Sequence, residues 1–167
     1  MALLILETLT KESFSPFGDV IEIAGSDWFP INNGSTRRYH KLGLVDIGGD
    51  GGLPAISMAR GAAFHYPVGI SMLERHPLGS QSFIPCNGVS FIVVVAPSRP
   101  DGQPDERALR AFLANSDQGI NYLRGCWHHP LISLEHEGDF IVVDRVGSGH
   151  NCDEITLSQI YQIEAPF

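Results

Sequence analysis

Short apolar stretches recur along the whole chain, separated by glycines and prolines. The longest, residues 91–97, has the length of a buried strand rather than of a helix. Period-two alternation between turn residues predicts β-strands. The strands predicted in this way span residues 3–7, 19–23, 28–31, 38–47, 55–58, 62–66, 71–75, 81–85, 90–96, 126–128, 131–135, 140–144 and 159–164. Their number and spacing indicate an all-β antiparallel sandwich or closed barrel.

The predicted helices are few and short. Thr10 can cap a first helix that runs to residue 14. A second helix is expected after Pro104, with Asp105 as its cap, because residues 109, 112 and 113 would place apolar side chains on one helical face. Residues 46–54 contain four glycines and are expected to form an exposed loop, with a mobile lid as the alternative.

Length and composition indicate one domain over residues 1–167. A chain of 167 residues with 43% hydrophobic and 18% charged residues can bury a single core. Its formal net charge of −8 repels phosphate, so nucleic acid is an unfavourable partner and a small molecule a favourable one.

The cysteines and the apolar runs bear on location. Cys86, Cys126 and Cys152 are odd in number and lack C-x-x-C spacing, so reduced, buried thiols in a cytoplasmic protein are expected. No stretch approaches the ~20 apolar residues of a membrane span. The first residues lack the basic region and cleavage site of an export signal, so no membrane association is expected.

One group of polar residues points to chemistry. Glu74 and His76 alternate along a predicted strand and can face the same side. Gln81 follows after four residues at the start of the next predicted strand, from which it can face them across a hairpin, and Gly88 after six more. His128, on a later strand, is the fourth candidate for the same interior.

This spacing resembles the cupin superfamily, whose first motif is His-x-His, three or four residues, Glu, six residues, Gly. Glu74 and Gln81 replace a histidine and the glutamate, while residues 123–128 (LRGCWH) resemble the second motif, Pro-x-Gly-x-x-His, with leucine in place of proline. Glu74, His76, Gln81 and His128 are therefore the candidate metal ligands. The alternative for Gln81 is a hydrogen bond to an amide or urea-like group of a substrate.

A wider resemblance covers nearly the whole chain. The chain is similar to the ureidoglycolate lyase family of allantoin degradation in residues 29–34 (FPINNG), 38–40 (RYH), 73–79 (LERHPLG), 109–112 (LRAF), 119–122 (GINY) and 127–131 (WHHPL), with Asp144-Arg145 and Asn151-Cys152. The resemblance implies a cupin-like jelly roll and a homodimeric cytoplasmic enzyme that splits (S)-ureidoglycolate into glyoxylate and urea. It also implies nickel or another divalent metal as a candidate cofactor.

Such a cleavage assigns roles to the candidate residues. Elimination needs a base at the substrate hydroxyl and an acid at the departing urea nitrogen. Glu74 or His76 is the predicted base and His128 the predicted acid, because their side chains titrate in a suitable range. A bound metal would be the alternative means of acidifying the hydroxyl.

The substrate carboxylate calls for an arginine, whose planar fork binds a carboxylate at two points. Arg38 and Arg145 are the candidates, since Arg75 should face away from Glu74 and His76 by strand alternation. Asn32 is a candidate partner of the urea amide, and Tyr39 a candidate lining residue. His65, His136 and His150 are expected at the surface.

Three other functions remain open from the sequence. A hydrolase would release ammonia and carbon dioxide from the same substrate and would need a firmly held metal. A metabolite-binding sensor would use the same fold without catalysis. An oxygen-dependent iron cupin would need the ligands that Glu74 and Gln81 replace here.

Overall fold

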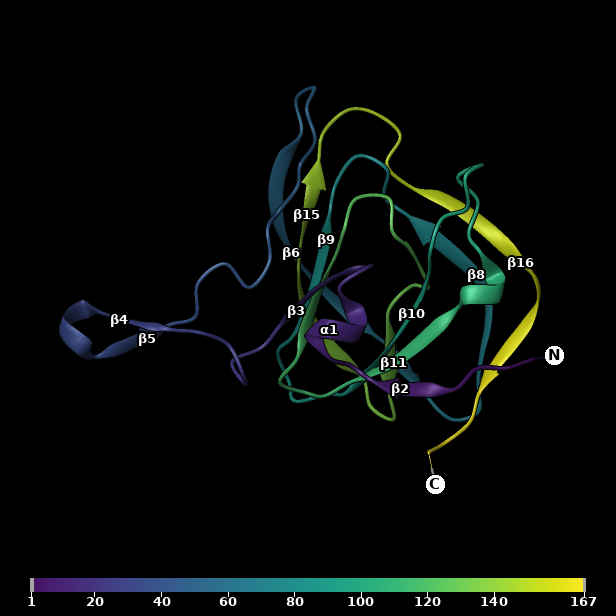
Figure 1. Ribbon diagram of the computed structural model, residues 1–167, viewed down its shortest axis with the longest axis horizontal. Helices are drawn as coiled ribbons and strands as arrows, with labels where there is room; N and C mark the ends of the chain where they lie inside the picture. Colours follow the sequence, from purple (N-terminus) through teal and green to yellow (C-terminus); the bar gives the residue numbers. More distant parts are fainter. Residues whose placement is uncertain (1, 167) are drawn as a thin grey trace.

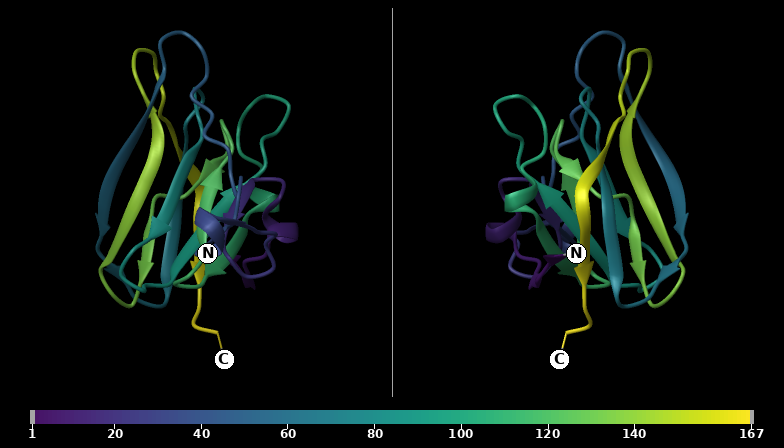
Figure 2. Two further views of the ribbon diagram at one scale, coloured as in Figure 1. Left: turned by 90° about the vertical axis from the view of Figure 1, so that its left-hand side faces the viewer. Right: turned by 90° about the vertical axis from the view of Figure 1, so that its right-hand side faces the viewer.

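Two β-sheets lie face to face, and a two-stranded arm projects from them (Figures 1 and 2). The computed structural model describes residues 2–166. The nine-stranded sheet contains β1 (Ala2–Leu3), β2 (Leu6–Thr8), β7 (Ala63–Phe64), β8 (Val68–Arg75), β10 (Phe91–Ala96), β11 (Arg110–Ala114), β13 (Trp127–His128), β14 (Ile132–Leu134) and β16 (Asp153–Ile163). The five-stranded sheet contains β3 (Gly18–Ile21), β6 (Leu53–Gly61), β9 (Gln81–Pro85), β12 (Gly119–Tyr122) and β15 (Gly138–Val146).

The arm is formed by β4 (Phe29–Ile31), the 3₁₀ turn η1 (Asn32–Gly34) and β5 (Thr36–Arg38). Two helical segments complete the fold: α1 (Lys11–Phe14), which Thr10 caps as predicted, and the 3₁₀ turn η2 (Glu106–Ala108). The expectation of a β-dominated jelly roll with few short helices is therefore confirmed.

The predicted closed barrel is wrong. The five-stranded sheet has the order β3-β12-β9-β15-β6, so β3 and β6 each have a single neighbouring strand and remain open edges. The predicted hairpin between β8 and β9 is also wrong, because β8 pairs with β13 and β16, whereas β9 pairs with β12 and β15. Residues 76–80 thus cross between the sheets, with β8 in the nine-stranded sheet and β9 in the five-stranded sheet.

Two further expectations fail for local reasons. The helix after Pro104 is only the turn η2, which Asp105 caps through the N–H of Arg107, and β11 follows it. Ala111 and Phe112 are both buried, and a strand buried on both faces loses the alternation that separates it from a helix. The strand predicted over residues 38–47 ends at Arg38, and Lys41 has a positive φ of 55°, which a strand cannot contain.

The core lies on both sides of β10. Ile92, Val94 and Ala96 belong to one cluster of buried side chains, and the alternate residues Phe91, Val93 and Val95 belong to a second. This confirms the long apolar run as a buried strand. In the part of the chain that the structure describes, no helix has the length and apolarity needed to cross a membrane.

A bidentate ion pair joins the chain's first strands to β11. The guanidinium of Arg110 donates to both carboxylate oxygens of Glu7 at 2.9 and 2.6 Å, and to the carbonyl of Ser13 at 2.9 Å. The hydrogen bonds from Arg110 lower the pKa of the Glu7 carboxyl below its usual range. A carboxyl whose pKa is lowered by folding stabilises the protein above its unfolded pKa and loses this effect as pH falls through the folded value.

We expect the Glu7→Gln variant to lower the free energy of unfolding at pH 7 by about 0.5–1 kcal/mol, a modest value because both side chains are partly exposed. The difference from wild type should begin to shrink as pH falls below about 4, where unfolded carboxyls become protonated, and should be lost as pH falls through the lowered pKa of folded Glu7. Urea unfolding of wild type and variant at pH 7 and pH 3 measures this difference in free energy. Asp117→Asn, in an exposed turn, is the control. An equal difference at both pH values would contradict the pair's role.

The thiols differ in their exposure. Cys86 and Cys152 are exposed, which contradicts the expected burial of all three cysteines, and Cys126 packs against the second core cluster. Burial raises the pKa of the Cys126 thiol to about 12. Burial and the nearby carboxylate of Glu74 also raise the pKa of the exposed Cys152 thiol. Because the thiolate is the reactive form, iodoacetamide at pH 8 should alkylate Cys86 first and Cys152 more slowly, while Cys126 stays unmodified. Peptide mass mapping checks this, and all three cysteines should react in urea.

Candidate active site

Glu74, His76 and His128 converge between the two sheets. Glu74 is in β8, directly opposite His128 of β13, and His76 follows the end of β8. Glu74 Oε1 lies 3.4 Å from His128 Nε2 and 3.8 Å from His76 Nε2. The side chains of Glu74, His76 and His128 are 19%, 15% and 2% exposed, so the cluster is largely enclosed.

Backbone carbonyls fix how both imidazoles present their ring nitrogens. His76 Nδ1 lies 2.7 Å from the carbonyl of Asn151, and His128 Nδ1 lies 2.9 Å from the carbonyl of Cys126. A carbonyl only accepts, so each Nδ1 carries a proton and each Nε2 is free to act as a base or ligand. Both Nε2 atoms are buried and have no hydrogen-bond partner among the described residues.

This arrangement fits a divalent metal ion. The candidate ligand atoms of Glu74, His76 and His128 all lie within 4.8 Å of one another. Two unpartnered imidazole nitrogens beside a carboxylate are a donor set that suits Zn²⁺, Ni²⁺ or Fe²⁺, and the Nδ1 contacts to carbonyls are the outer contacts typical of metal-binding histidines. These three residues would hold the ion.

The same three side chains also form a charged cluster without a metal. The interaction with His128 is the main cause that lowers the pKa of Glu74, and it outweighs the effect of burial. Tyr122 of β12 stacks on the His128 ring with centroids 4.0 Å apart. Burial raises the pKa of the Tyr122 hydroxyl well above its usual value, so this residue is a neutral wall of the site.

Gln81 enters the site from the opposite sheet. Its register partner in β12 is Tyr122, the residue that stacks on His128. Gln81 Nε2 donates to Asp144 Oδ2 at 3.1 Å, and because a carboxylate only accepts, this contact fixes the orientation of the amide. Gln81 Oε1 is buried and has no hydrogen-bond partner between residues 2 and 166, so it is an acceptor available to an N–H group of a ligand.

The predicted arginine ligands do not join this cluster. Arg145 is buried and donates to the carbonyls of Ile47 and Ser148. The hydrogen bond to Ile47 joins the loop of residues 46–52 to β15. Arg75 faces away as expected, pairing with Asp153 and stacking on Trp127. Asn32 lies in η1 and Arg38 in β5, both in the arm that Figure 1 shows projecting from the sheets, and Tyr39 directly follows β5.

Gly125 of the second motif positions His76. It has a positive φ of 73°, which favours glycine, and its N–H donates to the His76 carbonyl at 2.9 Å. Gly88 of the first motif also has a positive φ, of 74°, in the turn after β9.

His129 is turned to the Pro130 carbonyl, and burial lowers its pKa. His65, His136 and His150 are exposed, as predicted.

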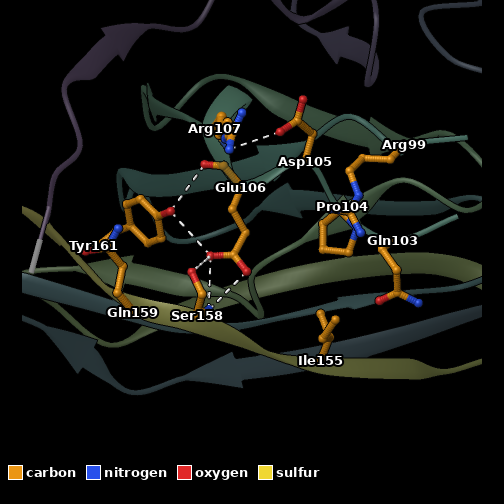
Figure 3. Close-up of a pocket in the computed structure, with 10 residues that line it drawn as sticks. All are labelled: Arg99, Gln103, Pro104, Asp105, Glu106, Arg107, Ile155, Ser158, Gln159 and Tyr161. Carbon is orange, nitrogen blue, oxygen red and sulfur yellow. Dashed lines mark hydrogen bonds between the residues drawn. The ribbon is translucent and has the colours of Figure 1, made fainter. Parts of the chain in front are cut away.

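A separate cavity of about 620 Å³ lies between η2 and β16 (Figure 3). Its central carboxylate, Glu106, accepts from the N–H and hydroxyl of Ser158 and from the hydroxyl of Tyr161. These contacts fasten η2 to the irregular stretch of β16. The cavity shares no residue with the cluster of Glu74, His76 and His128.

Sequence reasoning missed Asp144 and Tyr122 as parts of the site. Asp144 lies in β15 two residues after the buried Val142 and therefore on the same face, and an acidic residue at an inward position is a signal that alternation could have shown. Tyr122 offered no comparable signal, because an aromatic residue in a buried strand is ordinary core.

Comparison with known proteins identifies the family of this chain. The family model for ureidoglycolate lyase matches residues 1–164. The ureidoglycolate lyase of Pseudomonas aeruginosa is 56% identical over 163 residues, 98% of this chain and 95% of that protein. The ureidoglycolate lyase of Stutzerimonas stutzeri is 53% identical over 163 residues, with the same two coverages. That of Pseudomonas putida is 54% identical over 154 residues, 92% of this chain and 91% of that protein. This chain belongs to the ureidoglycolate lyase family.

Proposed function

We propose that this protein is a ureidoglycolate lyase that cleaves (S)-ureidoglycolate to glyoxylate and urea in allantoin and purine degradation. The observation that carries the proposal is the set of three buried, unpartnered atoms, namely the Nε2 atoms of His76 and His128 and Oε1 of Gln81. They provide a base, an acid and an acceptor for a urea group, which is what this cleavage requires.

The proton transfers follow from this arrangement. His76 Nε2 takes the hydroxyl proton, the C–N bond breaks as the aldehyde C=O forms, and His128 delivers a proton to the departing urea nitrogen. Glu74 stays ionised because its pKa is lowered, so it stabilises a protonated His128 rather than acting as the base. Gln81 Oε1 accepts from the urea amide, and Asp144 holds Gln81 in that orientation.

The proposal extends to a cofactor and to the enzyme's setting. Nickel or another divalent ion, held by Glu74, His76 and His128 with Gln81 beside them, would supply Lewis-acid activation of the substrate hydroxyl. We further propose a cupin-type enzyme that works as a homodimer in the cytoplasm, in keeping with its acidic surface and free thiols.

A single assay tests this function. Purified protein of known metal content is incubated with racemic ureidoglycolate, and glyoxylate, urea and ammonia are quantified. We expect glyoxylate and urea in equal amounts, with half of the racemate left unreacted. Ammonia in place of urea would identify a hydrolase, and the absence of glyoxylate would refute the proposal.

A further inference from the structure

Among residues 2–166, none of the cations of the chain's own candidate site is free to pair with the substrate carboxylate. Of the eleven lysines and arginines, most are already engaged: Arg60, Arg75, Arg99, Arg110 and Arg124 pair with carboxylates, Arg145 donates to two carbonyls, and Lys11 donates to Ser26. Those left are Arg37, Arg38, Lys41 and Arg107. Arg107 lines the separate cavity of Figure 3, so the remaining cations are on the arm.

The arm, defined as residues 28–41, lacks a partner in its own chain. Strands β4 and β5 pair with each other and with no other described strand, and Figure 1 shows them clear of both sheets. Trp28 and Phe29 are almost half exposed. Arg37 stacks on the Trp28 ring at 4.6 Å, whereas Arg38 makes no hydrogen bond or ion pair with any described residue. An exposed apolar arm of this kind is typical of a segment that binds another surface.

The charge of the arm favours a second copy as that surface. Residues 28–41 contain three basic residues and no acidic one. The rest of the chain therefore has 8 basic and 19 acidic residues, a formal charge of −11. A cationic arm on a strongly acidic body is complementary to the body of another copy.

The same chain carries an apolar surface that can receive the arm. At one end of edge strand β6, the exposed side chain of Leu53 lies beside the exposed side chain of Val146 in β15, on the face of the sheet that Asp144 shares. We name Leu53 and Val146 the β6 surface; Ile56 and Met58 are also exposed but lie on the opposite face by strand alternation. Val146 is two residues from Asp144, which holds Gln81 in the site. A segment that binds beside Leu53 and Val146 therefore lies at the rim of the candidate active site.

We propose that the arm of one subunit lies on the β6 surface of a second copy and presents Arg38 to the substrate carboxylate in that copy's site. The inference rests on the proposed function, because the carboxylate is that of ureidoglycolate. A two-fold dimer satisfies both arms at once, since the arm and the β6 surface occur on every subunit. Arg38, with a free planar fork, is suited to a two-point contact with a carboxylate.

Mixed dimers test this arrangement. Chains carrying Arg38→Ala and chains carrying His128→Ala are given different tags, coexpressed and purified as heterodimers. Each homodimer should be impaired, and Arg38→Ala should lower kcat/KM about 10- to 100-fold, mainly through KM, as expected for loss of a charged hydrogen bond. In the heterodimer, one of the two sites combines an intact His128 with an intact Arg38 from the other subunit. Activity should return to about half of the wild-type value.

Each outcome is decisive. If Arg38 acts within its own chain, the heterodimer stays as inactive as the homodimers, and the inference fails while the lyase function stands. A monomeric wild-type protein in light scattering, or an Arg38→Ala homodimer with wild-type kinetics, also overturns it. Arg107→Ala is the matched control and should behave as wild type. If the wild-type protein forms no glyoxylate, the proposed function itself fails.

Discussion

The His128→Ala variant is expected to release urea from ureidoglycolate about 10²–10⁴-fold more slowly than the wild-type enzyme, the usual contribution of a general acid or base. His128 is 2% exposed, faces Glu74 at 3.4 Å and is stacked by Tyr122, so no other described side chain occupies its position. Steady-state measurements of glyoxylate should show the loss in kcat, because the proton is delivered only in the transition state.

The controls separate catalysis from folding. A truncated buried side chain also destabilises the core, so His128→Gln, which fills most of the space, should be as inactive as His128→Ala while unfolding closer to wild type. His65→Ala removes a histidine that pairs with Glu135 at the surface and should leave turnover unchanged. Turnover of His128→Gln within tenfold of wild type would exclude His128 as the acid.

The sequence predicted the inward cluster because its signal was local. Glu74 lies in β8 and His76 directly after the end of that strand, and a strand period of two continued to His76 predicts both side chains on one face. The convergence with His128 depended on a motif spacing that the structure reproduces. Gln81 was expected across a hairpin, yet it reaches the site from the opposite sheet, because residues 76–80 cross the sandwich.

What could not be predicted depends on contacts distant in sequence. Whether a buried arginine is free or engaged depends on carbonyls such as those of Ile47 and Ser148, which accept hydrogen bonds from Arg145. The arm had the alternation of an ordinary strand pair, and nothing in its residues shows that it stands apart from the sheets. Because β11 is buried on both faces, its apolar residues lack strand alternation, and the sequence was interpreted as a helix.

The chemistry of the candidate site depends on one carboxylate, that of Glu74. With both Nδ1 atoms held by carbonyls, two imidazole lone pairs and the ionised Glu74 face one another. Three acceptors in contact need a cation between them, and the cation is either a proton on an imidazole or a metal ion. Glu74 is required in both cases, because it supplies the negative charge that offsets the cation.

Glu74→Gln is therefore expected to lower kcat about 10²–10³-fold, within the range typical of acid–base residues, while leaving the fold intact because the amide has the shape of the carboxyl. Titration with Ni²⁺ followed by calorimetry should also show weaker binding than for wild type, since a neutral amide is a poor ligand. Glu154→Gln is the matched control: Glu154 lies opposite Glu74 in β16, is exposed, and forms with Cys152 the alternative metal group around Glu74. If Glu154→Gln weakens Ni²⁺ binding and His76→Ala does not, the ion binds on the outer side of Glu74, and the inward cluster works with protons alone.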